Sequence, residues 1–138
     1  MAGKRERRDI QDWPKRGEIH LTALDPAVGH EIRKTRPALI IQNDVSNRYS
    51  QVTMVAPITS TVRLPLSPLH VLLPAGGATG LAVASVALFN QVRTVDRRRL
   101  VKRLGRIDGA LMDQVDEAIR LAFGLAPDQP APIAPAGV

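Results

Sequence analysis

Few side chains in this sequence could carry polar chemistry, because its 138 residues include no cysteine and three histidines. Without cysteine there are no disulfides, thiolate metal sites or thiol nucleophiles. The histidines lie too far apart for a metal-binding spacing. His20 and His70 fall on predicted strands, where a structural role is commoner, so His30, in a polar loop, is the functional candidate. We therefore predict neither a metal nor another cofactor.

Arg36 stands directly before an apolar run, Pro37 to Ile41. A guanidinium is planar, always charged and bidentate toward phosphate. It therefore suits the charge that builds on phosphoryl oxygens when the 2′-OH of RNA attacks the adjacent phosphate. It hardly donates or accepts protons, so other groups must take the 2′ proton and protonate the leaving 5′ oxygen.

Thr59 and Ser60 stand at the end of another predicted strand. Either hydroxyl could hydrogen-bond a phosphate oxygen or relay a proton. Spacing in the sequence does not by itself show that these hydroxyl groups meet Arg36.

The chain is strongly basic, with a formal net charge of +6 and a pI of about 10.7. Residues 93–106, RTVDRRRLVKRLGR, hold seven Arg or Lys residues and one acidic residue. This stretch is either a solvated helix face or a surface for phosphate or an acidic partner, because Lys and Arg supply most nucleic-acid affinity by neutralising phosphates.

The elements that position these residues are predicted to be strands followed by a helix. The alternation in GEIHLTAL is typical of a half-buried strand, and the continuous apolar run in PALIIQN of a central strand. Asp108 can cap a helix of about fifteen residues with apolar residues at three-and-four spacing, closed by Gly124. Segment 97–104 is predicted as a shorter helix, 43–50 as a turn and 76–80 as a hairpin loop. The predicted strands are 17–24, 37–43, 51–58, 70–74 and 85–95, the last as one strand or two short ones.

This order predicts an α+β, mainly β domain, a small β-barrel with helices at one end. We expect the domain at 16–125, between a flexible basic arm at 1–15 and a disordered Pro- and Ala-rich tail at 126–138. No apolar run reaches the roughly 18 residues of a membrane span, and no signal-peptide segment is present. We therefore expect a cytoplasmic protein without membrane contact.

Five blocks occur in order with short gaps: RGEIHLTALDPAVGHE (16–31), TRPALIIQND with NRYS (35–50), VAPITS (55–60), LPLSPLHVLL (64–73) and NQVRTVDRRRLVKRLGRID (90–108). In these blocks the sequence resembles the MazF/PemK (Kid) family of toxin endoribonucleases. The resemblance implies an SH3-like β-barrel with a C-terminal helix, of the CcdB/PemK kind, usually as a homodimer.

The resemblance also implies a function. Such toxins cleave single-stranded RNA at short sequence motifs without a metal, mostly mRNA, with rRNA and tRNA as further candidates. The 2′-OH route leaves 2′,3′-cyclic phosphate and 5′-OH ends, and translation and growth stop. A cognate antitoxin of the MazE kind neutralises the toxin by covering the RNA groove with an acidic, flexible C-terminal segment.

The matching motifs assign roles to residues of this chain. Arg36, of the RP pair, corresponds to the active-site arginine, Thr59 to its partner threonine, and Ser60 is a weaker candidate beside it. Gln91 lies in the base-contacting region. The residues expected to contact RNA also include Gly29, His30, Glu31, Arg33, Lys34, Thr35 and Arg93. Contacts to RNA phosphates or to the antitoxin are expected from Arg97, Arg98, Lys102 and Arg103.

One loop departs from the family pattern, since GHEIRKTRP stands where GSEQGGxRP is common. His30 takes the Ser-like position, and Arg33 and Lys34 take the positions of the glycines. We expect a stiffer, more basic loop and an altered cleavage motif. His30 either assists proton transfer, because an imidazole exchanges protons near neutral pH, or stacks on a base, or is purely structural.

Two other functions are compatible with the same fold. A CcdB-like toxin of this barrel type acts on gyrase, so the fold alone does not decide the chemistry. A catalytically inactive module that binds RNA or the antitoxin is the other alternative. The pair of Arg36 and Thr59 favours the ribonuclease.

Overall fold

The computed structural model describes residues 12–125 of the chain. Its seven strands form one antiparallel sheet in the order β4-β5-β3-β2-β1-β7, and β6 also pairs with β3. The predicted tail and most of the predicted N-terminal arm lie outside the described residues. The strands are β1 (Glu18–Ala23), β2 (Thr35–Ile40), β3 (Val52–Thr59), β4 (His70–Leu73), β5 (Ser85–Leu88), β6 (Arg93–Asp96) and β7 (Leu100–Arg106).

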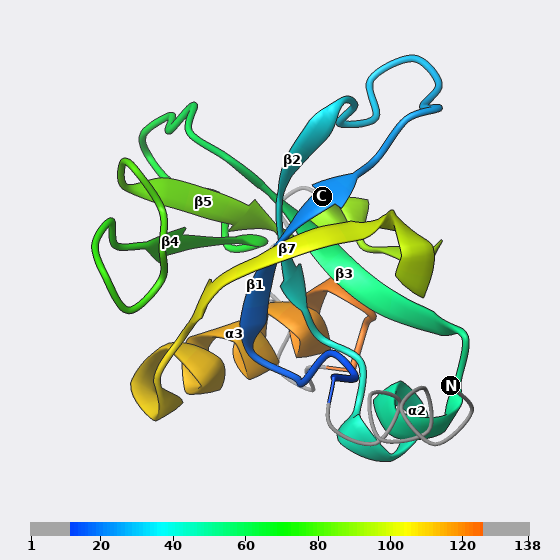
Figure 1. The fold of residues 1–138 in the computed structure, drawn as a ribbon. Coiled ribbons are helices and arrows are strands. Elements are labelled where there is room, and N and C mark those ends of the chain that lie inside the picture. The colour runs from blue at the N-terminus through cyan, green and yellow to red at the C-terminus, as the bar shows by residue number, and fades with distance from the viewer. Residues whose placement is uncertain (1–11, 126–138) are drawn as a thin grey trace, which may run out of the picture.

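Four helical segments complete the described part of the chain. They are α2 (Asp44–Tyr49), the 3₁₀ turns η1 (Phe89–Gln91) and η2 (Arg97–Arg99), and α3 (Gly109–Ala122). The mainly β class with a C-terminal helix is confirmed. The sheet is not closed, since β4 and β7 stand at the two ends of its pairing order. It is curved, because β4 and β5 run across the direction of β1 and β2 (Figure 1). None of the helices in the described part has the length and apolarity that crossing a membrane requires.

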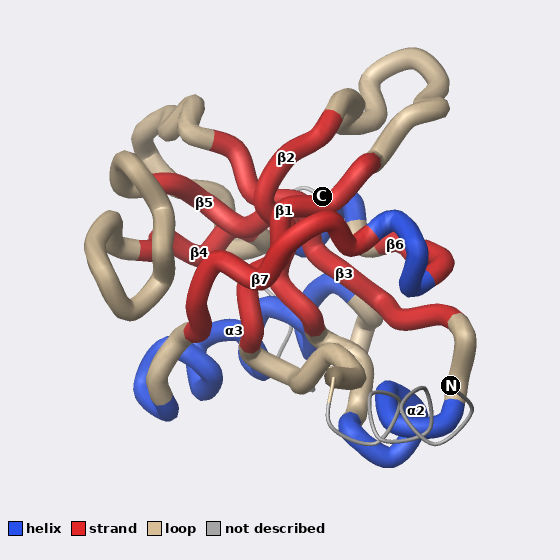
Figure 2. Tube along the Cα trace, in the orientation of Figure 1, coloured by secondary structure: helices blue, strands red, loops and turns tan. Residues whose placement is uncertain are grey.

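The central strand β2 is buried on both faces, as its apolar run predicts. Successive side chains of a strand point to opposite faces. Leu39 therefore joins the larger core cluster and Ala38 and Ile40 the smaller one, all with no exposed surface. The helix α3 covers the larger cluster, so the smaller cluster lies on the other face of the sheet (Figures 1 and 2).

The predicted C-terminal helix is confirmed as α3. The side chain of Asp108 accepts a hydrogen bond from the backbone N–H of Leu111 at 2.9 Å, which satisfies one free donor of the first turn. Val115 and Ala118 are buried against the sheet. Gly124, just beyond the helix end, has a φ of 74°, a left-handed conformation that glycine adopts without strain.

The helix predicted at 97–104 is wrong. Only Arg97–Arg99 form a 3₁₀ turn, and the following residues form the strand β7. The free edge of β1 explains this difference, because β7 pairs along it from Glu18 to Thr22 and satisfies its backbone groups. Local spacing of apolar residues could not reveal that edge.

The turn predicted at 43–50 is also wrong, because residues Asp44–Tyr49 form the helix α2. Asn43 caps it by accepting a hydrogen bond from Ser46 N at 2.8 Å. Asn47 is fully buried, accepts from Thr53 Oγ1 at 2.7 Å and from Gln42 Nε2 at 3.0 Å, and donates to Gln42 O at 2.8 Å. This buried polar network, invisible in a polar sequence, fixes α2 to the start of β3.

The hairpin loop predicted at 76–80 is confirmed between β4 and β5, and it packs tightly on β7. Arg106 N donates to Ala78 O at 2.9 Å. A Cβ on Gly105 would lie 2.3 Å from Ala78 O, and one on Gly80 would lie 2.1 Å from Leu104 O. Only glycine allows the two backbones to approach this closely. The predicted stretch 85–95 forms two strands, β5 and β6, with η1 between them.

Gly105→Ala is expected to lower the free energy of unfolding by about 3 kcal/mol, because backbone atoms cannot yield to the added methyl group. Gly77→Ala in the same loop is the control. A Cβ there meets nothing within 4 Å, so the expected change stays within about 0.5 kcal/mol. Urea unfolding of both variants measures the difference, and equal stability of the two would contradict this contact.

Candidate active site

Arg36 and Thr59 lie at the same edge of the sheet, on neighbouring antiparallel strands. The β2–β3 ladder ends at the pair of Ala38 and Pro57, and beyond that end Arg36 and Thr59 each lie two residues further along their own strand. Residues two apart in a strand share a face, so both belong to the face of Ala38 and Pro57. The regular ladder ends there, and the next residues of β3, Ile58 and Thr59, pair with β5 instead.

Two cavities open beside this edge. The first, about 550 Å³, lies between the β1–β2 loop and η1, with Pro57 of β3 in its wall. The second, about 390 Å³, includes Thr59 and residues of the segment between β3 and β4. Asn90 and Gln91 line both cavities. The two are therefore parts of one groove, called the η1 groove below, and each has the size of a small-ligand site.

The β1–β2 loop is fixed over the groove by Ile32. Its backbone N–H donates to Oε1 of Gln91 at 2.8 Å, and its side chain packs on the smaller core cluster. At the base of the loop, Leu24 N donates to Lys34 O at 3.0 Å and Lys34 N to Asp25 Oδ1 at 2.9 Å. The second half of the loop is thus held at both ends, at Ile32 and at Lys34.

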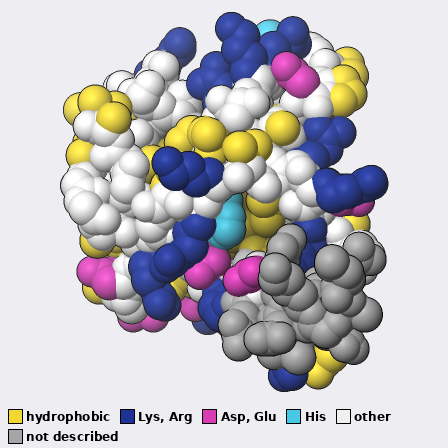
Figure 3. Space-filling view, viewed as in Figure 1, with side chains coloured by type: hydrophobic (Ala, Val, Ile, Leu, Met, Phe, Trp, Pro, Cys, Tyr) yellow, Lys and Arg dark blue, Asp and Glu magenta, His cyan; other side chains and the backbone are white. Residues whose placement is uncertain are grey.

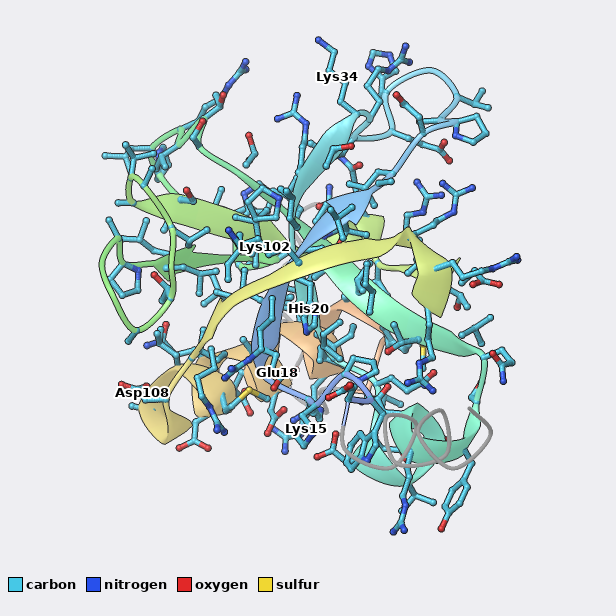
Figure 4. All side chains as sticks on the ribbon, viewed as in Figure 1. Lys15, Glu18, His20, Lys34, Lys102 and Asp108 are labelled. Atoms are coloured by element: carbon cyan, nitrogen blue, oxygen red, sulfur yellow. The ribbon has the colours of Figure 1, made fainter. Side chains whose placement is uncertain are left out.

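Lys34 has a φ of 74°, the left-handed region that favours glycine. This position is one of the two where the sequence has a basic residue in place of a glycine. Lys34 lies near the top of the molecule, away from the centre of the sheet where His20 and Lys102 lie (Figure 4). Its side chain lines neither part of the η1 groove.

Arg36 is half-buried and held from the loop side. Its Nε donates to Arg33 O at 2.8 Å, and Nη2 of Arg33 in turn donates to Gly29 O at 2.9 Å. Pro37 restricts the backbone of Arg36 to extended conformations. Within the described residues, the two Nη groups of Arg36 make no hydrogen bond, so the outer fork of the guanidinium is available for a phosphate.

The predicted site residues fall into three groups. His30, Glu31, Gln91 and Arg93 line the first cavity and Thr59 the second. Arg93 also donates through Nη1 to Leu24 O at 2.8 Å, so it holds the chain directly after β1 as well. The predicted residues outside both cavities are Gly29, Arg33, Lys34, Thr35, Arg36 and Ser60. The third group, Arg97, Arg98, Lys102 and Arg103, lies beside β7 and away from the groove.

Several groove residues were missed from the sequence, among them Asn90, Arg63 and His70. Asn90 lines both cavities, and Arg63 and His70 line the second. Asn90 directly precedes Gln91, so its position was the available signal. His70, for which a structural role was expected, lines the second cavity. The same role was expected for His20, whose Nε2 lies 3.0 Å from Glu18 Oε1 within β1.

Comparison with known proteins gives consistent matches over the described domain. Residues 15–123 match the family described as "PemK-like, MazF-like toxin of type II toxin-antitoxin system". The chain is 40% identical to Endoribonuclease EndoA of Bacillus subtilis (strain 168) over 111 residues, 80% of this chain and 95% of that protein.

Solved structures show the same fold. The Mycobacterium tuberculosis toxin MazF-mt6 has a TM-score of 0.66 and 30% identity, covering 79% of this chain and 98% of that one. A chain of a MazE-MazF crystal structure from Deinococcus radiodurans has a TM-score of 0.61 and 25% identity, covering 83% and 99%. The match spans nearly the full length of each relative.

Gln91→Leu is expected to release the β1–β2 loop, because Ile32 N loses its acceptor. Loss of one such hydrogen bond is worth about 1 kcal/mol, or roughly a fivefold to tenfold faster exchange of the Ile32 amide. Hydrogen exchange followed by NMR measures it. Asn90→Ala, on the same turn, is the control and leaves that amide protected. An unchanged Ile32 amide in Gln91→Leu would show that the loop is held by other contacts.

Proposed function

The chain belongs to the PemK-like, MazF-like toxin family of type II toxin–antitoxin systems, and we propose that it is a sequence-preferring endoribonuclease acting on single-stranded RNA. The observation that carries this proposal is the end of the β2–β3 ladder, beyond which Arg36 follows on one strand and Thr59, which lines the η1 groove, on the other. The name of the Bacillus relative, an endoribonuclease, supports the same activity.

The proposed reaction is attack of a ribose 2′-OH on the adjacent phosphorus. The bond from O2′ to phosphorus forms while the bond from phosphorus to O5′ breaks, giving a 2′,3′-cyclic phosphate and a 5′-OH. One proton leaves O2′ and one is delivered to O5′. All atoms come from the RNA, and we propose that protein side chains, without a metal, move the protons and stabilise the charge.

Arg36 is proposed to stabilise the charge on the nonbridging phosphoryl oxygens. Its Nε is held by Arg33 O, so its Nη groups are oriented before substrate arrives and need little reorganisation. Thr59 positions a phosphate oxygen or relays a proton through its hydroxyl. Its Oγ1 also accepts a hydrogen bond from Thr61 N at 3.2 Å, which orients that hydroxyl. Ser60 is exposed and outside the groove, and stays a weaker candidate.

Bases of the RNA are proposed to lie in the η1 groove. Oε1 of Gln91 is occupied by Ile32 N, so its amide NH₂ is the group left for a base edge. Asn90 offers both a donor and an acceptor to either cavity. Specific RNA recognition uses such contacts with unstacked bases, so these two residues and the loop would set the cleavage motif.

We also propose a cognate acidic antitoxin, a homodimeric toxin and a cytoplasmic site of action on mRNA, with rRNA and tRNA as further substrates. The Deinococcus structure contains MazE together with MazF, which supports an antitoxin partner. Translation takes place in the cytoplasm, so arrest of growth through RNA cleavage requires the toxin there.

Arg36→Ala and Thr59→Val are each expected to lower the rate of RNA cleavage by roughly a hundredfold or more, since each removes a group from the transition state. Single-turnover cleavage in the presence of EDTA measures the rate. Arg120→Ala, on the exposed side of α3, is the control and cleaves normally. Full activity of Arg36→Ala would refute the assignment.

The same assay tests the chemistry. An RNA with 2′-deoxyribose at the cut site is expected to resist cleavage, because it lacks the nucleophile. Intact RNA with gyrase trapped on DNA would favour the gyrase-directed function. Intact RNA with antitoxin binding alone would favour the inactive module.

His30→Ala is expected to slow cleavage by about a hundredfold and to remove one limb of the pH profile, because His30 lines the first cavity and can exchange protons near neutral pH. The rate between pH 5 and pH 9, a range of roughly two units either side of neutrality, measures it. A changed KM with the same pH profile would assign His30 to base stacking. No change in rate, KM or pH profile would show that His30 has neither a proton-transfer role nor a stacking role.

A further inference from the structure

A second concave surface lies between β7, α2 and His20 of β1, with a volume of about 720 Å³. Five basic side chains and one tyrosine line it: Arg48, Tyr49, Arg97, Arg98, Lys102 and Arg103. We call it the β7 cleft. Figure 3 shows Lys and Arg side chains beside a histidine on this face of the molecule, with acidic side chains next to it.

The β7 cleft is separate from the η1 groove. Arg97 N donates to Gln51 O at 2.9 Å, directly before β3 begins at Val52, whereas Thr59 ends that strand. A rise of about 3.3 Å per residue puts the two ends about 23 Å apart. A group bound beside Arg97 therefore lies far from Thr59, whereas Leu100 of the cleft is two strands from Arg36, because both flank Thr22 of β1.

Two of its cations are already paired. Arg98 holds Asp96 through Nε at 3.0 Å and Nη2 at 3.2 Å, and these hydrogen bonds lower the pKa of Asp96. Arg103 Nε lies 3.1 Å from Oε2 of the buried Glu18. In the described part of the chain, Arg48, Arg97 and Lys102 have no carboxylate partner. The described residues thus hold three cations without an ion-pair partner around one hollow, against the single carboxylate of Asp12 in its lining, so the hollow keeps a net positive charge that attracts anions.

The tyrosine indicates which anion. Tyr49 is 72% exposed, and the guanidinium of Arg48 lies 5.2 Å from its ring centre. An exposed aromatic ring beside cations is the arrangement that binds single-stranded nucleic acid, because a base stacks on the ring while Lys and Arg follow the phosphates. An acidic peptide would use the cations and leave the ring without a partner.

The chain's own N-terminal residues are a poor occupant. Asp12 lines the cleft, and the residues before it contain Lys4, Arg5, Arg7 and Arg8 against two acidic residues. Like charge disfavours the binding of such a sequence in a basic cleft.

We propose that the β7 cleft is a second RNA-binding surface, which holds the phosphates and one base of single-stranded RNA outside the cleaved motif. The inference rests on the proposed function for its substrate. Contacts of this kind carry no sequence information and raise affinity for long RNA over short RNA. They also make binding dependent on salt.

The test compares Arg48→Gln/Lys102→Gln with the control Arg106→Gln/Arg120→Gln, which removes two exposed charges outside the cleft. The probes are uncleavable 2′-O-methyl RNAs of about 30 and about 8 nucleotides, the short one embedded in the long one. We expect the cleft variant to bind the long RNA about tenfold more weakly and the short RNA normally. Its slope of log affinity against log salt should be less steep by about 1.4, the value for two phosphates on a single strand.

Tyr49→Ala is expected to weaken binding of the long RNA about fivefold, because a base loses its stacking partner. Binding of inorganic polyphosphate should stay unchanged. Equal weakening of both would show a site for any polyanion and overturn the RNA assignment. Two other results would also overturn the RNA assignment. One is a cleft variant that binds both RNAs normally but no longer binds a Glu-rich peptide. The other is a wild-type protein that is dimeric by gel filtration and a cleft variant that is monomeric.

The two proposals can fail independently. Wild-type protein that cleaves no RNA refutes the proposed activity, while the length dependence of binding still decides the cleft. Wild-type protein that cleaves RNA, with no length-dependent loss in the cleft variant, refutes the cleft alone.

Discussion

The strand β3 is the constraint on which the rest of the structure depends, because it pairs with three others. Its middle residues pair with β2, its first half with β6, and Ile58 and Thr59 with β5. The chain between β5 and β6 cannot continue this pairing and forms η1. The turn η1 carries Asn90 and Gln91, so the groove exists because one strand is shared between partners that are out of register with each other.

The same strand positions the proposed catalytic residues. Its pairing with β2 ends at Ala38 and Pro57, and Arg36 and Thr59 follow beyond that end on the two strands, although 22 residues lie between them in the chain. The face of Ala38 carries the smaller core cluster, on which Ile32 packs, and Ile32 N binds Gln91 across the groove. Strand pairing, core packing and loop position are therefore parts of one arrangement, in which the guanidinium is oriented by backbone groups before substrate binds.

The side chains around the two ends of β3 differ in charge and chemistry. At one end, hydroxyl, amide and imidazole groups around a few cations suit contacts with particular atoms of a substrate. At the other end, cations and an exposed tyrosine suit attraction to a chain of phosphates of any sequence. An RNA-cleaving toxin with both surfaces would combine recognition of a short motif with affinity for long transcripts.

The sequence by itself determined what depends on neighbouring residues. The apolar run after Arg36 specified a central strand, the cap at Asp108 and its spacing specified α3, and ordered motifs indicated Arg36, Thr59 and Gln91. Only the tertiary structure decided what depends on distant partners. Segment 97–104 became a strand because β1 offered an edge, residues 44–49 became a helix because Asn47 completes a buried network, and Asn90 entered the site because β3 changes partners. Likewise the basic stretch was divided, with Arg93 in the groove and Lys102 in the cleft, because strand pairing places them on different surfaces.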